Sequence, residues 1–421
     1  MNLLISLVVI IVNDDLKPNI RFRGFTENWE KQKLSRLATM HARIGWQNLR
    51  TSEFLDSGEY MLITGTDFID GRINFSTCHY VEKERYEQDK NIQINNGSIL
   101  ITKDGTLGKV AYVQELTKPA TLNAGVFNVG IIDKNQTDNK YLFQYLKAPF
   151  LMNYVVQKAT GGTIKHLNQS ILVDFPIIAP NKSEQEKIGE LFFKLDDLIM
   201  INRKKCNKLK GLQKSLLEKM FPNNEIDIPS VRFKGFNKNW KYKELNEVVE
   251  ITSGQNVGNE INGKYYNLTM GSVDIDGNLL YSLRTNNSDK LLTKGTLIMP
   301  TRDVGAGYVI GRTAVIDKNN KYYAGNCLYC LKPYEDDPYY IHYYMNSELA
   351  RKSIQSIIAG GSQKQITLPG IKSISIPICK TSEQIMIAKI FNNLDKLITL
   401  YEFKYDKLNK IRQSLLNEMF V

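Results

Sequence analysis

The sequence predicts an α+β protein in which two mixed α/β domains form a pseudo-twofold repeat and are separated by two long antiparallel coiled-coil helices. Three observations lead to this prediction: a length of 421 residues, which suits two or three domains, two pairs of internal repeats, and a heptad pattern within the second pair. A hydrophobic content of 42% excludes a disordered or fibrous chain.

The repeats define a duplicated frame. Residues 20–38 read IRFRGFTENWEKQKLSRLA, and residues 231–249 read VRFKGFNKNWKYKELNEVV. Residues 184–221 match residues 383–420 without a gap and with 16 identities in 38 positions, where unrelated sequences would give about two. The interiors of the two halves differ, so the frame holds two diverged inserts. This pattern is typical of one task carried out on two different targets.

The frame divides the chain into five segments. Residues 1–17 form an apolar tail that we set apart from the fold, because its apolar run is too short to span a bilayer and lacks the basic start and cleavage site of a signal peptide. The other segments are a first domain at 18–182, a central helix at 183–222, a second domain at 223–381 and a C-terminal helix at 382–421.

The second repeat pair predicts long helices at 184–220 and 383–419, because an apolar residue recurs every seven positions. The residues at position a of this heptad are Ile188, Leu195, Asn202, Leu209 and Leu216 in one helix and Ile387, Leu394, Tyr401, Leu408 and Leu415 in the other. Position d takes Leu191, Leu198, Lys205, Leu212 and Lys219 in the first helix and Ile390, Leu397, Lys404, Ile411 and Glu418 in the second, so polar residues interrupt the seam. An antiparallel pair within the chain is the economical arrangement, and two separate amphipathic helices, each on its own domain, remain the alternative.

The inserts read as mixed strand and helix. Short apolar strands are predicted at 97–102 and 295–300, and each leads into a glycine-containing loop and a further strand at 110–113 or 308–310. Aromatic helical stretches follow at 141–154 and 339–358.

The sequence offers no catalytic constellation. Neither glycine loop matches a P-loop or a dinucleotide-binding turn, and the Asn/Asp-Pro-Pro-aromatic motif of amino-methyltransferases is missing. Cys327 and Cys330 form a lone CxxC pair without a second ligand pair, so we expect structural thiols and no metal. Five scattered cysteines fit a reducing cytoplasm, and a net charge of +11 makes a polyanionic partner plausible.

Four features that each occur twice carry a resemblance to a known family. They are an Arg-Phe-x-Gly-Phe motif followed by Trp, a Gly-Gly turn, Ser-Glu-Gln opening a heptad helix, and Ser-Leu-Leu with Met-Phe closing it. Together they resemble the specificity subunit of type I restriction–modification systems, over about residues 18–421.

The resemblance implies two target-recognition domains, each reading one half of a bipartite site in double-stranded DNA. It implies that the helices set the spacing of the half-sites and dock two methyltransferase subunits, which bind S-adenosylmethionine and methylate adenine. A motor–nuclease restriction subunit that uses ATP and Mg²⁺ would join for cleavage. The chain itself would be a cytoplasmic protein without a membrane partner, and would bind no cofactor and catalyse nothing.

Base readout needs polar side chains on loops, whereas Lys and Arg at phosphates only position the protein. The candidate DNA-binding residues lie in the Gly-Gly turns and the strand-end loops, and they are Lys103, Lys109, Thr163, Lys165 and His166 in the first domain and Arg302, Ser362, Lys364 and Gln365 in the second. Each is equally compatible with a structural role in a turn. Two other readings stay open: an autonomous DNA methylase or nuclease, and a coiled-coil scaffold that does not bind DNA.

Overall fold

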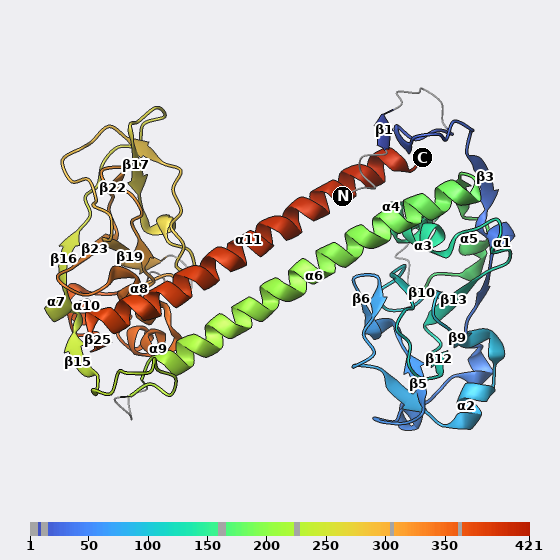
Figure 1. Cartoon of the computed structure of the whole chain (residues 1–421), viewed down its shortest axis with the longest axis horizontal. Helices are drawn as coiled ribbons and strands as arrows, with labels where there is room; N and C mark the ends of the chain where they lie inside the picture. Colours follow the sequence, from blue (N-terminus) through green and yellow to red (C-terminus); the bar gives the residue numbers. More distant parts are fainter. Residues whose placement is uncertain (1–6, 10–15, 159–165, 223–227, 304–306, 361–363) are drawn as a thin grey trace. The chain divides into compact units, whose positions relative to one another are not determined.

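The computed structural model describes residues 7–9, 16–158, 166–222, 228–303, 307–360 and 364–421. The chain divides into two compact units. Unit 1 comprises residues 1–203 and 403–421, and unit 2 comprises residues 204–402. Each unit therefore contains one domain together with parts of both long helices (Figure 1).

Unit 1 is built on a six-stranded and a four-stranded sheet. The six-stranded sheet has the order β4 (Ala38–His41), β13 (Val126–Ile131), β10 (Ile99–Thr102), β11 (Val110–Tyr112), β7 (Arg72–Ile73) and β6 (Phe68–Ile69). The four-stranded sheet has the order β8 (His79–Val81), β5 (Tyr60–Ile63), β12 (Ala120–Leu122) and β9 (Gln93–Ile94). A separate pair joins β14 (Pro176–Ala179) to β3 (Glu30–Lys33). The short helices are α1 (Leu34–Leu37), α2 (Lys83–Glu87), α3 (Asn139–Lys147), α4 (Pro149–Lys158) and α5 (Gln169–Val173).

Unit 2 repeats this plan with fewer strands among the residues described. One sheet has the order β16 (Val249–Ser253), β23 (Leu328–Pro333), β19 (Leu297–Pro300) and β21 (Ala314–Val315), and another has β18 (Arg284–Thr285), β17 (Tyr265–Leu268) and β22 (Tyr322–Ala324). Two pairs join β15 (Lys241–Glu244) to β25 (Ser375–Ile378) and β20 (Arg302–Asp303) to β24 (Lys364–Gln365). The short helices are α7 (Leu245–Val248), α8 (Pro338–Asn346), α9 (Glu348–Ser356) and α10 (Leu368–Lys372).

The repeat extends into the inserts, where the sequences look unrelated. Helices α3, α4 and α5 return 199 residues later as α8, α9 and α10. The parallel pair β5–β12 has its counterpart in β17–β22, and the antiparallel pair β10–β13 has its counterpart in β19–β23. A common strand framework survives because a core needs apolar residues of suitable volume at inward positions, which many different sequences provide.

The predicted long helices are confirmed as α6 (Lys182–Met220) and α11 (Thr381–Met419), each of 39 residues. In unit 2 the side chains of Lys210 and Glu402 form an ion pair at 2.6 Å, and Gln213 Nε2 donates to Asp395 Oδ1 at 2.5 Å. A higher residue number on α6 is thus paired with a lower residue number on α11, which means that the two helices are antiparallel within this unit. In unit 1, α11 meets α6 where Arg412 pairs with Asp196.

The heptad pattern is confirmed at position a and wrong at several d positions. Of the position-a residues, Ile188, Leu195, Ile387, Leu394 and Leu415 are buried, and Leu209, Leu216 and Leu408 are half-buried. These residues belong to the cores of the domains, so the helix ends pack on their own domain as well as on each other. The d-position leucines Leu198, Leu212 and Leu397 are 47%, 47% and 42% exposed, which a regular coiled-coil seam would not allow.

The Glu-Gln pair that opens each long helix explains two of the repeated motifs. Glu184, which is 0% exposed, accepts two hydrogen bonds from Arg21 at 2.8 Å each, and Glu383 binds Arg232 in the same bidentate way at 2.7 and 2.9 Å. The side-chain amide of the next residue contacts the start of α3: Gln185 Oε1 accepts a hydrogen bond from the backbone N–H of Asp138, the N-cap of α3. Gln384 does the same for Asp337, the N-cap of α8.

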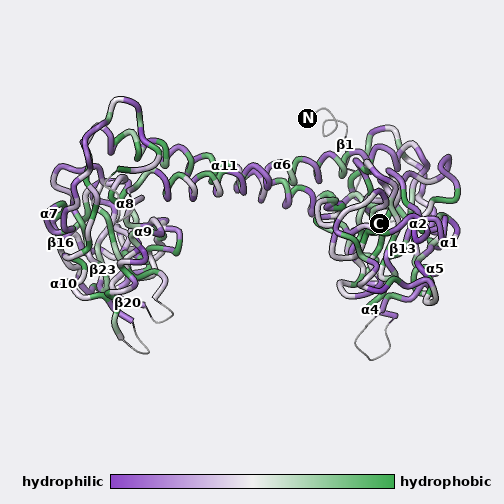
Figure 2. The backbone as a smooth tube through the Cα atoms, turned by 90° about the horizontal axis from the view of Figure 1, so that it is seen from below, coloured by the Kyte–Doolittle hydropathy of each residue, from purple (hydrophilic) through white to green (hydrophobic). Residues whose placement is uncertain are grey.

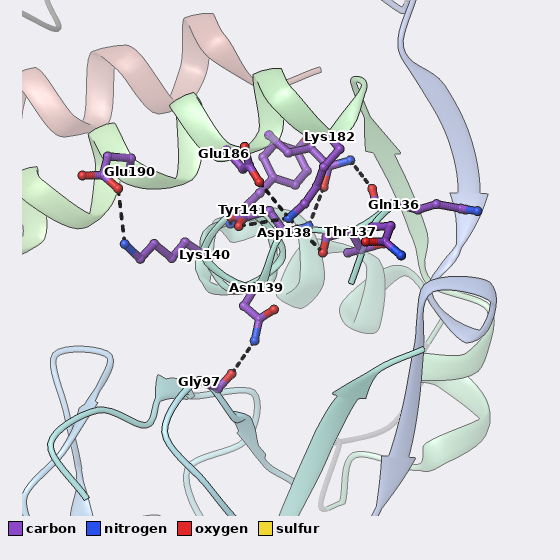
Figure 3. Close-up of polar contacts among 12 residues, drawn as sticks. Gly97, Gln136, Thr137, Asp138, Asn139, Lys140, Tyr141, Lys182, Glu186 and Glu190 are labelled. Carbon is purple, nitrogen blue, oxygen red and sulfur yellow. Dashed lines mark hydrogen bonds and ion pairs between the residues drawn. The ribbon is translucent and has the colours of Figure 1, made fainter. Parts of the chain in front are cut away.

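Further polar contacts hold α3 between α6 and the sheet. Lys140 pairs with Glu190 at 3.3 Å, and Asn139 Nδ2 donates to the carbonyl of Gly97 just before β10 (Figure 3). Lys182 at the start of α6 reaches both Asp138 and Glu186 (Figure 3). The direction of α3 is therefore fixed by α6 on one side and by the loop before β10 on the other.

The strand predicted at 308–310 is wrong, and part of the apolar tail belongs to a sheet. Residues 308–310 are not a strand: they form a bend and a turn, and the next strand along the chain, β21, begins four residues further on and pairs with β19. Ile310 is nevertheless buried, and its carbonyl accepts a hydrogen bond from Arg351, so its apolar character marks core packing rather than a strand. In the apolar tail, β1 (Leu7–Val9) pairs antiparallel with β2 (Ile20–Phe22), so these three residues take part in a sheet.

All five cysteines are free thiols. Burial raises the pKa of Cys78 and of Cys330 to about 12, so both are held as neutral core thiols at physiological pH. Within the described ranges, no helix has the length and apolar character needed to cross a membrane.

Candidate nucleic-acid interface

In unit 1 the loop after β10 is closed by backbone and side-chain contacts of Thr102. The Thr102 N–H donates to the carbonyl of Lys109 at 2.9 Å, and its hydroxyl accepts from the Lys109 N–H at 3.0 Å. Gly105 and Gly108 both have φ of +71°, a conformation that favours glycine in so tight a loop. Lys109 therefore lies at the base of the loop, with an exposed side chain.

The segment that follows the Gly-Gly turn packs against this loop. The backbone N–H of Leu167 donates to the carbonyl of Lys103 at 2.8 Å. His166 Nδ1 lies 2.5 Å from Asp104 Oδ1, and the side chains are 70% and 41% exposed. The structure thus brings Lys103 and His166, predicted as separate candidates, into one exposed junction.

Unit 2 builds the equivalent junction from a two-stranded ladder. Strand β20 pairs with β24, so that Arg302 lies opposite Gln365 and Asp303 lies opposite Lys364. The backbone N–H of Ile366 donates to the carbonyl of Thr301 at 3.0 Å, which matches the Leu167–Lys103 bond of unit 1. Arg302 and Gln365 are exposed, and Figure 2 shows β20 at the end of this unit that is remote from its helix pair.

The two junctions share one backbone hydrogen bond, from Leu167 or Ile366 to the end of a strand, and they differ in their side chains. Leu167 and Ile366 are equivalent in the repeat, 199 positions apart, and both are buried. Each donates its backbone N–H to the carbonyl that directly follows a strand, β10 in unit 1 and β19 in unit 2. Unit 1 presents exposed His166 with half-buried Lys103 and Asp104. Unit 2 presents exposed Arg302 and Gln365 with half-buried Asp303 and Lys364. A fixed frame that presents different donors and acceptors is suited to reading two different base sequences.

Of the nine predicted residues, six fall in these junctions or at their base. Thr163, Lys165 and Ser362 lie outside the described residues. Sequence reasoning missed Asp104 and Asp303, which follow Lys103 and Arg302 directly. A basic–acidic neighbour pair after each central strand was the available signal, and carboxylates accept hydrogen bonds from cytosine N4.

Over the described parts of the chain, no group of three or more His, Cys, Asp or Glu side chains is arranged to hold a metal ion. His342 is held neutral: burial lowers its pKa to about 4, and its Nδ1 lies 3.2 Å from the Asn346 amide.

A family model described as the type I restriction modification DNA specificity domain matches residues 26–211 and again residues 237–410. The chain belongs to this family. Each match takes in one domain with the greater part of the long helix that follows it, so the family unit is the repeat seen in the structure.

Individual members of the specificity family are similar over parts of the chain. The MjaIX specificity subunit of Methanocaldococcus jannaschii is 32% identical over 170 residues, which are 38% of this chain and 37% of that protein. The MjaVIII specificity subunit of the same organism is 21% identical over 212 residues, 49% of this chain and 48% of that protein. The matches thus span less than half the length of either relative.

A solved structure supports the fold over a longer span. The type I restriction–modification system S subunit from M. genitalium aligns with a TM-score of 0.62 and 18% identity, covering 96% of this chain and 99% of that one.

Proposed function

We propose that this specificity-family chain recognises a bipartite sequence in double-stranded DNA, with each unit reading one half-site through its strand-end junction. The observation that carries the proposal is the duplicated junction, in which an equivalent backbone hydrogen bond is flanked by different polar side chains. Net charge of +11 supports a polyanionic partner, because cationic residues gain free energy by releasing counterions from DNA.

The long helices have a separate role in this proposal. Two helices of 39 residues, each about 58 Å long at 1.5 Å per residue, would set the spacing between half-sites and dock two methyltransferase subunits. Those partners would bind S-adenosylmethionine and methylate adenine, and a restriction subunit that uses ATP and Mg²⁺ would join for cleavage. This chain would supply sequence recognition and assembly, not catalysis.

The experiment that tests the proposal exchanges one insert. The chain is co-expressed with its methyltransferase subunit, and adenine methylation is mapped across the genome. Replacing residues 39–160 by the corresponding insert of a relative should change one half of the methylated sequence, and replacing residues 250–359 should change the other. If one exchange altered both halves of the methylated sequence, the two units would not read their half-sites independently. Methylation by the chain alone would favour an autonomous methylase.

Arg302 offers a test at a single residue. We expect Arg302→Ala to weaken duplex binding by the assembled complex and, if the guanidinium contacts a phosphate, to lower the slope of log K against log salt by about 1. If it contacts a guanine, the slope stays and discrimination at one base pair falls by about 1–3 kcal/mol. Lys318→Ala is the control, because Lys318 is an exposed lysine outside the β20–β24 ladder. Equal binding by both variants would remove Arg302 from the interface.

A further inference from the structure

A second duplicated feature lies between the domain and the helix pair of each unit, remote from the strand-end junctions. In unit 1 a cavity of about 200 Å³ is lined by the turn between β6 and β7, by α3 and by both long helices. In unit 2 a cavity of about 570 Å³ is lined by the equivalent elements. The matching turns read Ile69-Asp70-Gly71-Arg72 and Ile275-Asp276-Gly277-Asn278.

The repeat allows the two linings to be compared position by position. The carboxylates are kept, because Asp70 and Asp196 correspond to Asp276 and Asp395. The cations are not kept. Four cationic residues line the unit 1 cavity, Arg72, Lys147, Arg203 and Arg412, and their counterparts are Asn278, Asn346, Glu402 and Gln213.

The positive charge is therefore dispensable for holding a domain on the helix pair, since unit 2 does this without it. Two cations do line the unit 2 cavity, but Lys210 is paired with Glu402, and Arg312 donates to the carbonyl of Asn346 at 2.8 Å. Asp276, Asp395 and Glu402 outnumber them. In unit 1 the four cations face three carboxylates, Asp70, Asp196 and Asp197, so an excess of positive charge remains in unit 1 alone.

Inside the unit 1 cavity one carboxylate serves several donors. Asp196 accepts from Lys147 Nζ at 2.9 Å, from Arg412 Nε at 2.7 Å and from Gln144 Nε2 at 2.8 Å. Arg72 is held by Asp197 at 2.9 Å, and Arg203 forms an ion pair with Asp70. The side chains of Arg72, Lys147 and Arg412 are only 12%, 21% and 16% exposed, so these cations are weakly screened by water.

Lys147 is an enclosed cation on which burial and neighbouring cations act together. Burial lowers the pKa of its ammonium group, the proximity of Arg412 and Arg72 lowers it further, and Asp196 opposes the change. Within the described residues, Nη1 of Arg412 has no hydrogen-bond partner, while Nε and Nη2 of the same group are bonded to Asp196 and Gln144. A cluster with spare donors and excess positive charge favours an anion.

We propose that the unit 1 cavity binds a phosphate-class oxyanion between Lys147, Arg203 and Arg412. A water takes about 30 Å³, so a cavity of about 200 Å³ has room for a tetrahedral anion of five heavy atoms. Guanidinium groups match such an anion in geometry, and Lys147 adds a point charge. This site is separate from the proposed base-reading junctions and does not depend on them.

Titration of the full-length chain with inorganic phosphate at constant ionic strength, against chloride, tests the site. We expect saturable binding to wild type, and affinity reduced about tenfold or more in Arg203→Gln and in the double variant Lys147→Asn with Arg412→Gln, which installs the residues of unit 2. Lys194→Gln is the control, because Lys194 is an exposed lysine of α6 outside the cavity. Phosphate binding no stronger than chloride, or unchanged in Arg203→Gln, would overturn the proposal. Arg203 is 48% exposed, so its variant remains decisive if the double variant fails to fold.

A second arm identifies the source of the anion. If the group is a DNA backbone phosphate, duplex DNA added to the assembled complex displaces the bound phosphate, and Arg203→Gln lowers duplex affinity. If the group is free phosphate, both bind together and duplex affinity is unchanged. Either result requires the site, and neither depends on which bases are read.

Discussion

Replacing Glu184 by Gln is expected to destabilise unit 1 by about 3–5 kcal/mol, because it leaves the Arg21 guanidinium charged and buried without a counter-charge. Arg21 and Glu184 are 2% and 0% exposed, and they are joined by two hydrogen bonds of 2.8 Å. Amide hydrogen exchange in α3 reports the change, since a chain of two units need not unfold in a single step.

A surface ion pair in the same unit provides the control. Lys33 and Asp174 lie 2.7 Å apart but are 63% and 55% exposed, so Asp174→Asn should change stability by no more than about 1 kcal/mol. The double variant Arg21→Met with Glu184→Leu should recover much of the loss, because an apolar pair removes both buried charges. Equal protection in Glu184→Gln and Asp174→Asn would show that the buried pair does not hold the start of α6.

Phe420→Ala should cost about 3–5 kcal/mol, the range for deleting a buried phenylalanine ring. Phe420 is the penultimate residue of the sequence, yet it is 5% exposed and lies within 5.3–6.2 Å, ring centre to ring centre, of Phe192, Tyr141, Tyr145 and Phe150. Its repeat counterpart Phe221 has the same place in unit 2, against Trp240, Tyr340, Tyr344 and Phe391.

Phe403→Ala is the matched control for this experiment. Phe403 belongs to the same helix and the same unit, but it is 64% exposed, so its removal should change stability by about 0.5 kcal/mol or less. Thermal unfolding of both variants, followed by near-ultraviolet circular dichroism of the aromatic cluster, measures the difference. A loss in Phe403→Ala as large as in Phe420→Ala would mean that the cluster does not anchor the end of α11.

The sequence by itself determined the duplication, the two long helices and the family. These features are visible because they are periodic: heptad spacing and repeat offsets depend on local geometry and on copying, not on contacts between distant segments. The helix bounds came within two residues, and the position-a residues were assigned to buried or half-buried sites.

Tertiary structure alone decided which residues meet. The contact of Leu167 with Lys103 and the pairing of β20 with β24 join segments more than 60 residues apart, so no local pattern records them. The apolar run 308–310 resembled a strand, but Ile310 fills the core from a turn, since burial and strand pairing require the same residue types. The exposure of Leu198, Leu212 and Leu397 likewise depends on which parts of each helix are covered by other elements, and heptad spacing in the sequence does not specify this.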